Sequence, residues 1–265
     1  MLSLRTPEPP PTDQPHLGVE VEFVCPYDET VELLVNLSRA TGSSDWVLQC
    51  NHDSFDEDDE TSYDSCEVCL PLLLRKSLGR GYRPDLSPLE ALLSELDDSN
   101  FSISCGMHFH LDVRQPVWTP LRKAFLVRTL YSRHDDLMAL VPEDRRVEEP
   151  WNSWLCVPNG RSTDRSLAAV SNQISSAKRT TGCSTSNYQS IEVRCMGGGA
   201  PFRDVSKFVG ILMDSYDVAR RVRLHSRSDL RLDDPALLAV SSFAEPDHDK
   251  DYVPTPLPQP SYSLS

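Results

Sequence analysis

The chain has 265 residues, of which 39% are hydrophobic, enough for one main folded domain with a sizeable core. A formal net charge of -14 at pH 7 argues against a broad basic surface for duplex DNA, because the chain would repel the phosphates. No run approaches the roughly 18 consecutive apolar residues of a membrane span, and the first residues lack the apolar core of a secretory signal. We therefore expect a cytoplasmic protein that binds neither nucleic acid nor membrane. The sequence carries no mark of its oligomeric state.

Both ends of the chain are predicted to be disordered. Residues 1–15 contain five prolines, and residues 241–265 are acidic and rich in proline. Such segments bury too little apolar surface to offset the entropy that ordering costs. Residues 16–240 are predicted to form the folded domain.

Strands and helices are predicted from the spacing of apolar residues along the domain. Alternating polar and apolar residues predict strands, and apolar residues three or four apart predict helices. Five strands are expected, at 17–25, 46–50, 66–70, 106–111 and 187–195. Four helices are expected, at 29–41, 87–96, 121–140 and 205–224. Seven of the twelve residues in 53–64 are acidic, which predicts a solvated loop or, alternatively, a cation-binding lid.

The polar faces of four strands carry an unusual set of side chains. A period of two places carboxylates, imidazoles and a guanidinium on one face of these strands: Glu20, Glu22, Glu67, His108, His110, Glu192 and Arg194. An ordinary half-exposed strand also alternates, so a single segment is weak evidence. However, solvated strand faces favour Thr, Lys, Ser and Gln. Glutamate and histidine bind divalent cations, whereas arginine binds phosphate or carboxylate. The four segments together predict a metal-dependent active site.

The eight cysteines are predicted to be reduced thiols, because a chain of this length needs no disulfides to be stable. A structural zinc site made by Cys50, His52, Cys66 and Cys69 is an alternative, since CxxC is half of many such sites. Against it, a CxxC within a strand points its two sulfur atoms to opposite faces. Both interpretations stay open.

The order of these motifs resembles the amidoligase family of the glutamine synthetase and glutamate-cysteine ligase superfamily. The matching segments are Gly-Val-Glu-Val-Glu-Phe at 18–23, Glu-Val-x-x-Pro at 67–71, Cys-Gly-Met-His-Phe-His at 105–110 and Glu-Val-Arg at 192–194. The resemblance covers about residues 17–224. It implies an α+β fold with a curved antiparallel sheet of the glutamine synthetase catalytic-domain type, helices packed on one face, and an amidoligase-like catalytic domain at 16–240. The residues after Arg194 depart from the family's more frequent Glu-Phe-Arg-x-Phe pattern.

The resemblance also implies an activity, namely ATP-dependent joining of a carboxylate to an amine through an acyl phosphate. It implies that Mg²⁺ or Mn²⁺ is held by Glu20, Glu22, Glu67, His108 and Glu192. Arg194 would neutralise the transferring phosphoryl group, His110 would approach the phosphates or the substrate, and Asp53 would be a ligand or the base on the amine side. The predicted contacts of the nucleotide are His110, Arg145, Arg146, Lys178 and Arg179.

Other interpretations of the same residues remain open. The sheet is also compatible with another metal-dependent enzyme, such as a hydrolase, and with an inactive scaffold that binds partners. Arg145 and Arg146 are equally compatible with a basic pair on the surface. The acid and the amine to be joined are small molecules or peptides whose identity the sequence does not give. The acidic composition favours a cationic amine, such as a polyamine or a lysine side chain.

Overall fold

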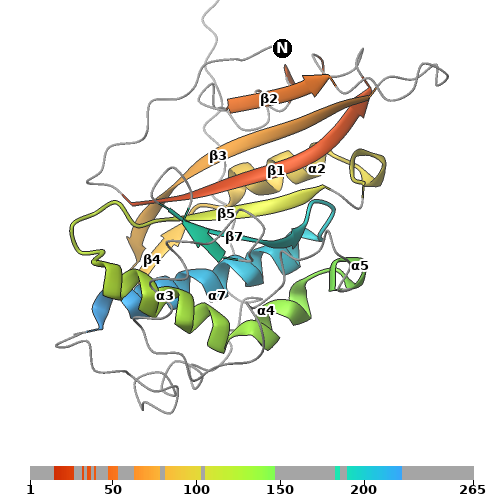
Figure 1. Cartoon of the computed structure of the whole chain (residues 1–265). Helices are drawn as coiled ribbons and strands as arrows, with labels where there is room; N and C mark the ends of the chain where they lie inside the picture. Colours follow the sequence, from red (N-terminus) through yellow and green to blue (C-terminus); the bar gives the residue numbers. More distant parts are fainter. Residues whose placement is uncertain are drawn as a thin grey trace, which may run out of the picture.

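The computed structural model describes residues 15–26, 47–52, 63–77, 81–102, 105–146, 183–185 and 190–222, together with a few helical residues between 32 and 39. Its fold is α+β, a curved antiparallel sheet with helices packed against it (Figure 1). Apart from Pro15, the predicted disordered ends lie outside the described residues, as does most of the acidic segment 53–64.

The sheet has seven strands, and every described pairing is antiparallel. The strands are β1 (His16–Pro26), β2 (Val47–His52), β3 (Tyr63–Ser77), β4 (Gly81–Pro84), β5 (Gly106–Asp112), β6 (Cys183–Thr185) and β7 (Ser190–Gly197). Their order across the sheet is β2-β3-β1-β5-β7-β6, with β4 pairing to β3. The four strands with predicted polar faces are therefore consecutive neighbours, in the order β3, β1, β5, β7.

Strand β1 shows how the sequence divides the sheet into two faces. Its burial alternates at every residue, and Val19, Val21 and Phe23 have almost no exposed surface. Glu20 and Glu22, which alternate with these apolar residues along the strand, are partly exposed. One face of the sheet is thus apolar and covered, whereas the other is polar.

The covered face packs against helices. The described α-helices with printed bounds are α2 (Ser87–Glu95), α3 (Pro120–Ser132), α4 (His134–Leu140), α5 (Glu143–Arg146) and α7 (Phe202–Arg221). Phe109 of β5 lies 5.3 Å from Phe208 of α7, measured between ring centroids. Leu89 of α2 and Phe125 of α3 belong to the same core cluster. Figure 1 shows α2 and α7 on the far side of the sheet.

Strand β3 is longer than predicted, because it continues through Pro71 to Ser77. Strand β2 pairs with β3 only as far as Cys69, and β4 begins to pair at Leu74, so among the described residues one edge of β3 has no partner strand at Pro71. The backbone N–H of Leu74 donates to the carbonyl of Pro15 (2.9 Å). Antiparallel alternation then turns the nitrogen of Pro71 away from β1. Proline is tolerated at such a free edge, since no ladder hydrogen bond is lost there.

The predicted helix 121–140 is in fact two helices, α3 and α4, separated at Arg133. No proline or glycine marks the break. Two hydroxyl groups hydrogen-bond to helix carbonyls just before it, Thr129 to Phe125 (2.8 Å) and Ser132 to Thr129 (2.7 Å). Such bonds compete with the backbone ladder and bend helices.

The remaining element predictions differ at their ends. The predicted helix 29–41 lies mostly outside the described residues; Val35, which was expected on its apolar side, is helical but 42% exposed. Helix α7 starts three residues earlier than predicted, and its Phe208, Leu212 and Tyr216 are fully buried, as its helical pattern predicts.

Candidate active site

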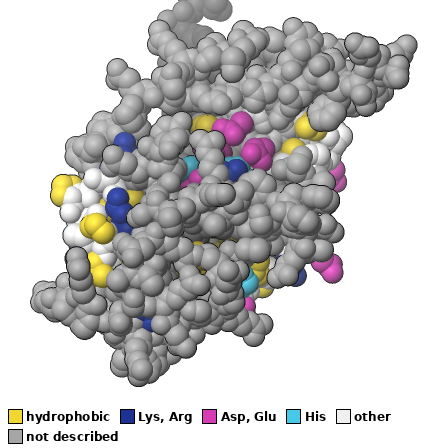
Figure 2. Space-filling view, viewed as in Figure 1, with side chains coloured by type: hydrophobic (Ala, Val, Ile, Leu, Met, Phe, Trp, Pro, Cys, Tyr) yellow, Lys and Arg dark blue, Asp and Glu magenta, His cyan; other side chains and the backbone are white. Residues whose placement is uncertain are grey.

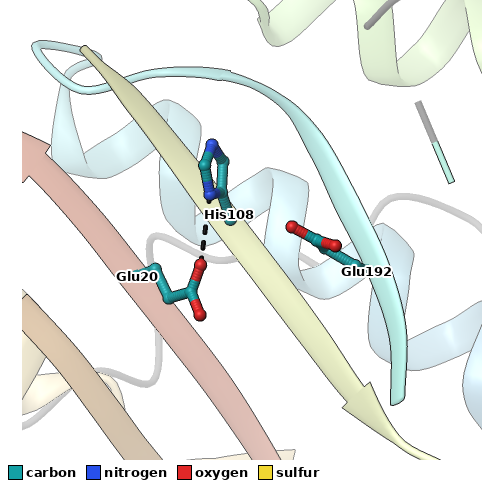
Figure 3. A group of neighbouring side chains, drawn as sticks. All are labelled: Glu20, His108 and Glu192. Atoms are coloured by element: carbon teal, nitrogen blue, oxygen red, sulfur yellow. Dashed lines mark hydrogen bonds and ion pairs between the residues drawn. The ribbon is translucent and has the colours of Figure 1, made fainter. Parts of the chain in front are cut away.

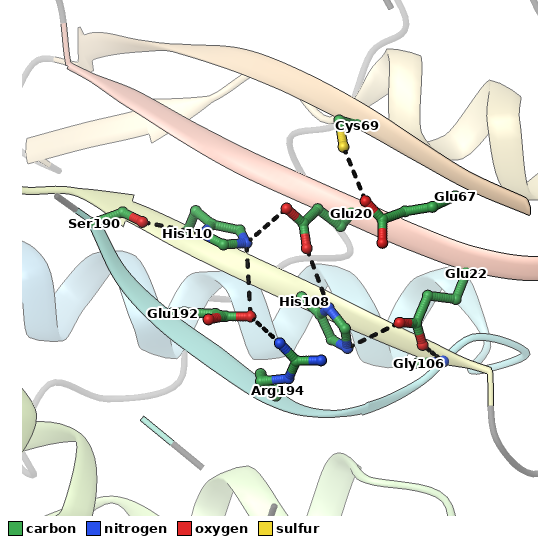
Figure 4. Close-up of polar contacts among 10 residues, drawn as sticks. All are labelled: Glu20, Glu22, Glu67, Cys69, Gly106, His108, His110, Ser190, Glu192 and Arg194. Carbon is green, nitrogen blue, oxygen red and sulfur yellow. Dashed lines mark hydrogen bonds and ion pairs between the residues drawn. The ribbon is translucent and has the colours of Figure 1, made fainter. Parts of the chain in front are cut away.

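The polar face of the sheet gathers the predicted residues through strand register. Glu20 lies opposite His108 of β5 and, on its other side, opposite Cys69 of β3. His110 lies opposite Glu192 of β7. Side chains from β1, β5 and β7 are linked by polar contacts, and the hydrogen-bonded pair of Cys69 and Glu67 on β3 lies beside them (Figure 4). Figure 2 shows acidic, imidazole and basic side chains together near the centre of this face of the molecule.

Glu20 is at the centre of the group, because each of its carboxylate oxygens contacts one imidazole. Oε2 lies 3.2 Å from Nδ1 of His108, and Oε1 lies 3.0 Å from Nε2 of His110. Burial alone would raise the pKa of Glu20, but the hydrogen bonds and charges of the two histidines outweigh it and hold that pKa well below its usual range. The carboxylate is therefore ionised. Burial likewise opposes charge on His110, but its hydrogen bond to Glu20 raises its pKa above the ordinary value.

Glu22 is held by the first residue of β5. The backbone N–H of Gly106 donates to Oε2 of Glu22 (2.7 Å), while Oε1 of Glu22 lies 3.7 Å from Nε2 of His108. His108, which is only 5% exposed in its side chain, therefore lies between two carboxylates. A backbone donor of this kind fixes the direction of a carboxylate without using a second side chain.

Glu192 and Arg194 form an ion pair on β7. Oε1 of Glu192 also lies 3.9 Å from Nε2 of His110, which links this pair to β5. The period of two predicted that both would share a face.

A register shift in β7 sets where Arg194 lies. Phe109 pairs with Val193 but Met107 pairs with Met196, so two residues of β7, Arg194 and Cys195, stand opposite the single His108. This irregularity returns Met196 to the buried face, where it has no exposed surface. Bulges next to sites of this kind re-aim side chains.

Glu67 occupies a different environment at the β3 side of the group. Its described hydrogen-bond partner is the thiol of Cys69, which donates to Oε1 across 3.4 Å. Burial and then the negative charge of Glu20 raise the pKa of Glu67 above its usual value. Burial also raises the pKa of Cys69, so its thiol stays protonated. Among the carboxylates of this group with a resolved pKa shift, Glu67 is the one whose pKa is raised rather than lowered.

The donor set of the group suits a divalent cation. Among the described residues, Glu20, His108 and Glu192 offer ligand atoms that all lie within 4.8 Å of one another, converging from β1, β5 and β7 (Figure 3). Glu20, Glu67 and Cys69 form a second such group. Carboxylate oxygens with one imidazole nitrogen are typical ligands of Mg²⁺ and Mn²⁺. The residues present therefore fit the implied metal, and Glu22 stands beside the first group.

The zinc alternative finds no support in the placement of the CxxC segment. Cys66 is 2% exposed and belongs to the hydrophobic core, whereas Cys69 is on the polar face with Glu67. The two sulfur atoms thus point to opposite faces of β3 and do not converge on one ion. The side chains of Cys50 and His52 lie outside the described residues.

The predicted nucleotide contacts are only partly described. Asp53, Lys178, Arg179 and the side chain of Arg145 lie outside the described residues. Arg146 is exposed and donates to the carbonyls of Val141 (2.6 Å) and Ala139 (3.1 Å), so its guanidinium closes the end of α4. The structure does not bring Arg146 into the polar group, although α5 does contact β7.

Two contributors to the group were not foreseen from the sequence. Ser190 places its hydroxyl 3.0 Å from Nδ1 of His110, and Gly106 holds Glu22 through its backbone. Ser190 shares the period of Glu192 and Arg194, and that spacing was the available signal. The backbone donor of Gly106 has no signal in the sequence.

Comparison of the chain with protein-family models, curated proteins and solved structures finds no match. Within the described residues, no helix is long and apolar enough to cross a membrane. The fold and the site together define a class of protein. It is an α+β protein whose curved antiparallel sheet carries, on its polar face, a group of side chains that could hold a metal ion.

Proposed function

We propose that the protein is an ATP-dependent carboxylate-amine ligase whose sheet is of the glutamine synthetase catalytic-domain type. The observation that carries the proposal is the convergence of carboxylates, imidazoles and a guanidinium on four neighbouring strands. Five of these side chains are at most 18% exposed: Glu20, His108, His110, Glu192 and Arg194. Such a set is costly to bury and is typical of functional sites.

The metal ligands of the proposal are Glu20, His108 and Glu192, with Glu22 and Glu67 beside them. A bound Mg²⁺ or Mn²⁺ would supply charge neutralisation for the polyphosphate and for the attacking carboxylate. Before metal binds, Glu20 is paired with both histidines and Glu192 with Arg194. These contacts hold both carboxylates in defined positions before a metal binds.

The proposed reaction has two steps. A carboxylate oxygen of the acid attacks the γ-phosphorus of ATP, ADP leaves, and an acyl phosphate forms. The amine nitrogen then attacks the acyl carbon, phosphate leaves, and the amine loses a proton. Arg194 faces the same polar surface as the metal ligands, so its planar donors would neutralise the transferring phosphoryl group. Asp53 remains our prediction for the group that accepts the amine's proton.

Calorimetry tests the proposal directly. ATP is titrated into the wild type with Mg²⁺, with Mn²⁺ and without metal, and then into a Glu20→Gln, Glu22→Gln double variant. We expect metal-dependent ATP binding by the wild type and its loss in the variant. A matched control, Glu95→Gln with Asp98→Asn, removes the same charge from exposed positions near the end of α2 and should bind as the wild type does.

The outcomes separate the three interpretations. Metal binding without any nucleotide binding would favour another metal-dependent enzyme, and binding of neither would favour an inactive scaffold. With an acid and an amine that support turnover, Glu22→Gln should abolish phosphate release while leaving thermal unfolding unchanged. Full turnover by Glu22→Gln would contradict the assigned metal site.

A further inference from the structure

Ser190 is a buried polar residue that lies next to the polar group. The proposed mechanism gives Ser190 no role. It is the first residue of β7 and is 5% exposed. In the sheet it pairs with Asp112, whereas Glu192 pairs with His110. Ser190 is therefore the diagonal cross-strand neighbour of His110, a separation at which side chains still interact. Its Oγ lies 3.0 Å from Nδ1 of the imidazole.

The other ring nitrogen of His110 lies near two carboxylates of the described residues. Nε2 lies 3.0 Å from Oε1 of Glu20 and 3.9 Å from Oε1 of Glu192. These distances place Nε2 between two carboxylate groups.

A hydroxyl is the suitable partner for the remaining nitrogen. Nδ1 accepts a hydrogen bond when it carries no hydrogen and donates one when it does. A serine hydroxyl serves in either case, whereas a carboxylate or an ammonium group serves in only one. Contacts at both ring nitrogens, one on β7 and one on β1, fix the rotation of the imidazole.

We propose that Ser190 is a positioning residue that orients His110 and, through it, Glu20 and Glu192. These two carboxylates are members of the proposed metal-ligand group, so the inference rests on the proposed function for its catalytic meaning. Groups that orient metal ligands from outside the ligand set typically change metal affinity by about 10–100-fold when removed. Ser190 acts through His110, one contact further out, so we expect an effect near the lower end, about tenfold.

The orientation of the ring is tested without metal or nucleotide. Nitrogen NMR of ¹⁵N-histidine protein, with His110 assigned from a His110→Gln sample, reports which ring nitrogen carries hydrogen and whether Nδ1 is hydrogen-bonded. Ser190→Ala should shift the Nδ1 resonance of His110 and leave in place the signals of histidines outside the polar group, such as His134. Ser190→Thr keeps the hydroxyl and should restore the wild-type spectrum. Ser215→Ala is the matched control, because it removes an equally buried hydroxyl that donates to Ile211 within α7 (2.9 Å).

Mn²⁺ titration then tests the consequence for the site. Ser190→Ala should weaken Mn²⁺ binding about tenfold, while Ser190→Thr and Ser215→Ala should match the wild type. An unchanged His110 spectrum in Ser190→Ala would overturn the inference, as would equal defects in the Ala and Thr variants. If the wild type binds no ATP, the proposed function fails. The NMR comparison nevertheless still decides whether Ser190 orients His110.

Discussion

The two faces of the central strands are stabilised by different kinds of interaction. On the covered face, Val21 and Phe109 pack against helices with almost no exposed surface. On the polar face of the same strands, Glu20 and His108 satisfy each other through specific hydrogen bonds. Apolar packing is non-directional and stabilises the fold, whereas partly buried charges cost desolvation and are stable only when paired. The comparison teaches that stability and chemistry can be perturbed separately in this sheet.

Truncation on the covered face should give the largest loss of stability. Phe109→Ala removes a ring that is fully buried and lies 5.3 Å from Phe208. We expect a destabilisation of about 3–5 kcal/mol, measured by urea unfolding followed by circular dichroism. Leu73→Ala is the control in the same sheet, because Leu73 is 36% exposed and should cost about 1 kcal/mol or less. Similar losses in both variants would show that the two faces are not divided in this way.

The polar face is itself divided, and Asp112 represents its well-compensated part. Asp112 follows His108 and His110 at the same period on β5 but accepts hydrogen bonds from Arg114, to Oδ1 and to Oδ2, each at 2.9 Å. The backbone N–H of Arg114 also donates to it (3.0 Å). Burial would raise the pKa of Asp112, but these bonds outweigh it and lower that pKa.

Removing this charge should therefore destabilise the protein in a pH-dependent way. A group whose folded pKa is lowered contributes stability above its unfolded pKa, near 3.9, and loses it as the pH falls through the folded value. Asp112→Asn should cost about 1–3 kcal/mol at pH 7, and the difference from the wild type should shrink below about pH 4. Urea unfolding at several pH values measures it, with the exposed Asp98→Asn as control. A difference that grows in acid would contradict the assignment.

Much of the fold could be predicted from the sequence, because hydrophobic periodicity is a local property. The alternation in β1 and the helical period around Phe208 each predicted an element that the structure contains. The extension of β3 through Pro71 could not be predicted, since it depends on where β2 and β4 stop pairing. The break at Arg133 depends on hydroxyl groups whose bonding the sequence leaves undetermined.

For the candidate site, the sequence predicted which face of a strand each side chain lies on, but not which other side chains it contacts. A period of two placed Glu20 beside Glu22, but strand order and register decided that Glu20 meets both histidines. The shift in β7 beside Arg194 arises from pairing and has no local signal. Ser190 had the right spacing but an ordinary side chain, so its role became visible only with its distance to His110.

Glu67 represents the poorly compensated part of the polar face. Asp112 has a guanidinium as its partner, whereas the described partner of Glu67 is the neutral thiol of Cys69. Burial and the charge of Glu20 raise the pKa of Glu67. The two carboxyl groups should therefore affect folding with opposite signs.

Neutralising Glu67 should stabilise the metal-free protein, the smallest effect of the three. A group whose folded pKa is raised contributes stability below its unfolded pKa, near 4.3, and loses it as the pH rises through the folded value. Glu67→Gln should thus be more stable than the wild type at pH 7 in EDTA, by about 0.5–1 kcal/mol, and the two should converge below about pH 4. Urea unfolding in EDTA measures the difference.

Adding Mn²⁺ should reverse the order of stability of the two proteins, because only the carboxylate gains from binding the cation. A Glu67→Gln variant that is less stable than the wild type in EDTA at pH 7 would show that this carboxylate is compensated after all, and that the polar face carries no cost for a cation to offset.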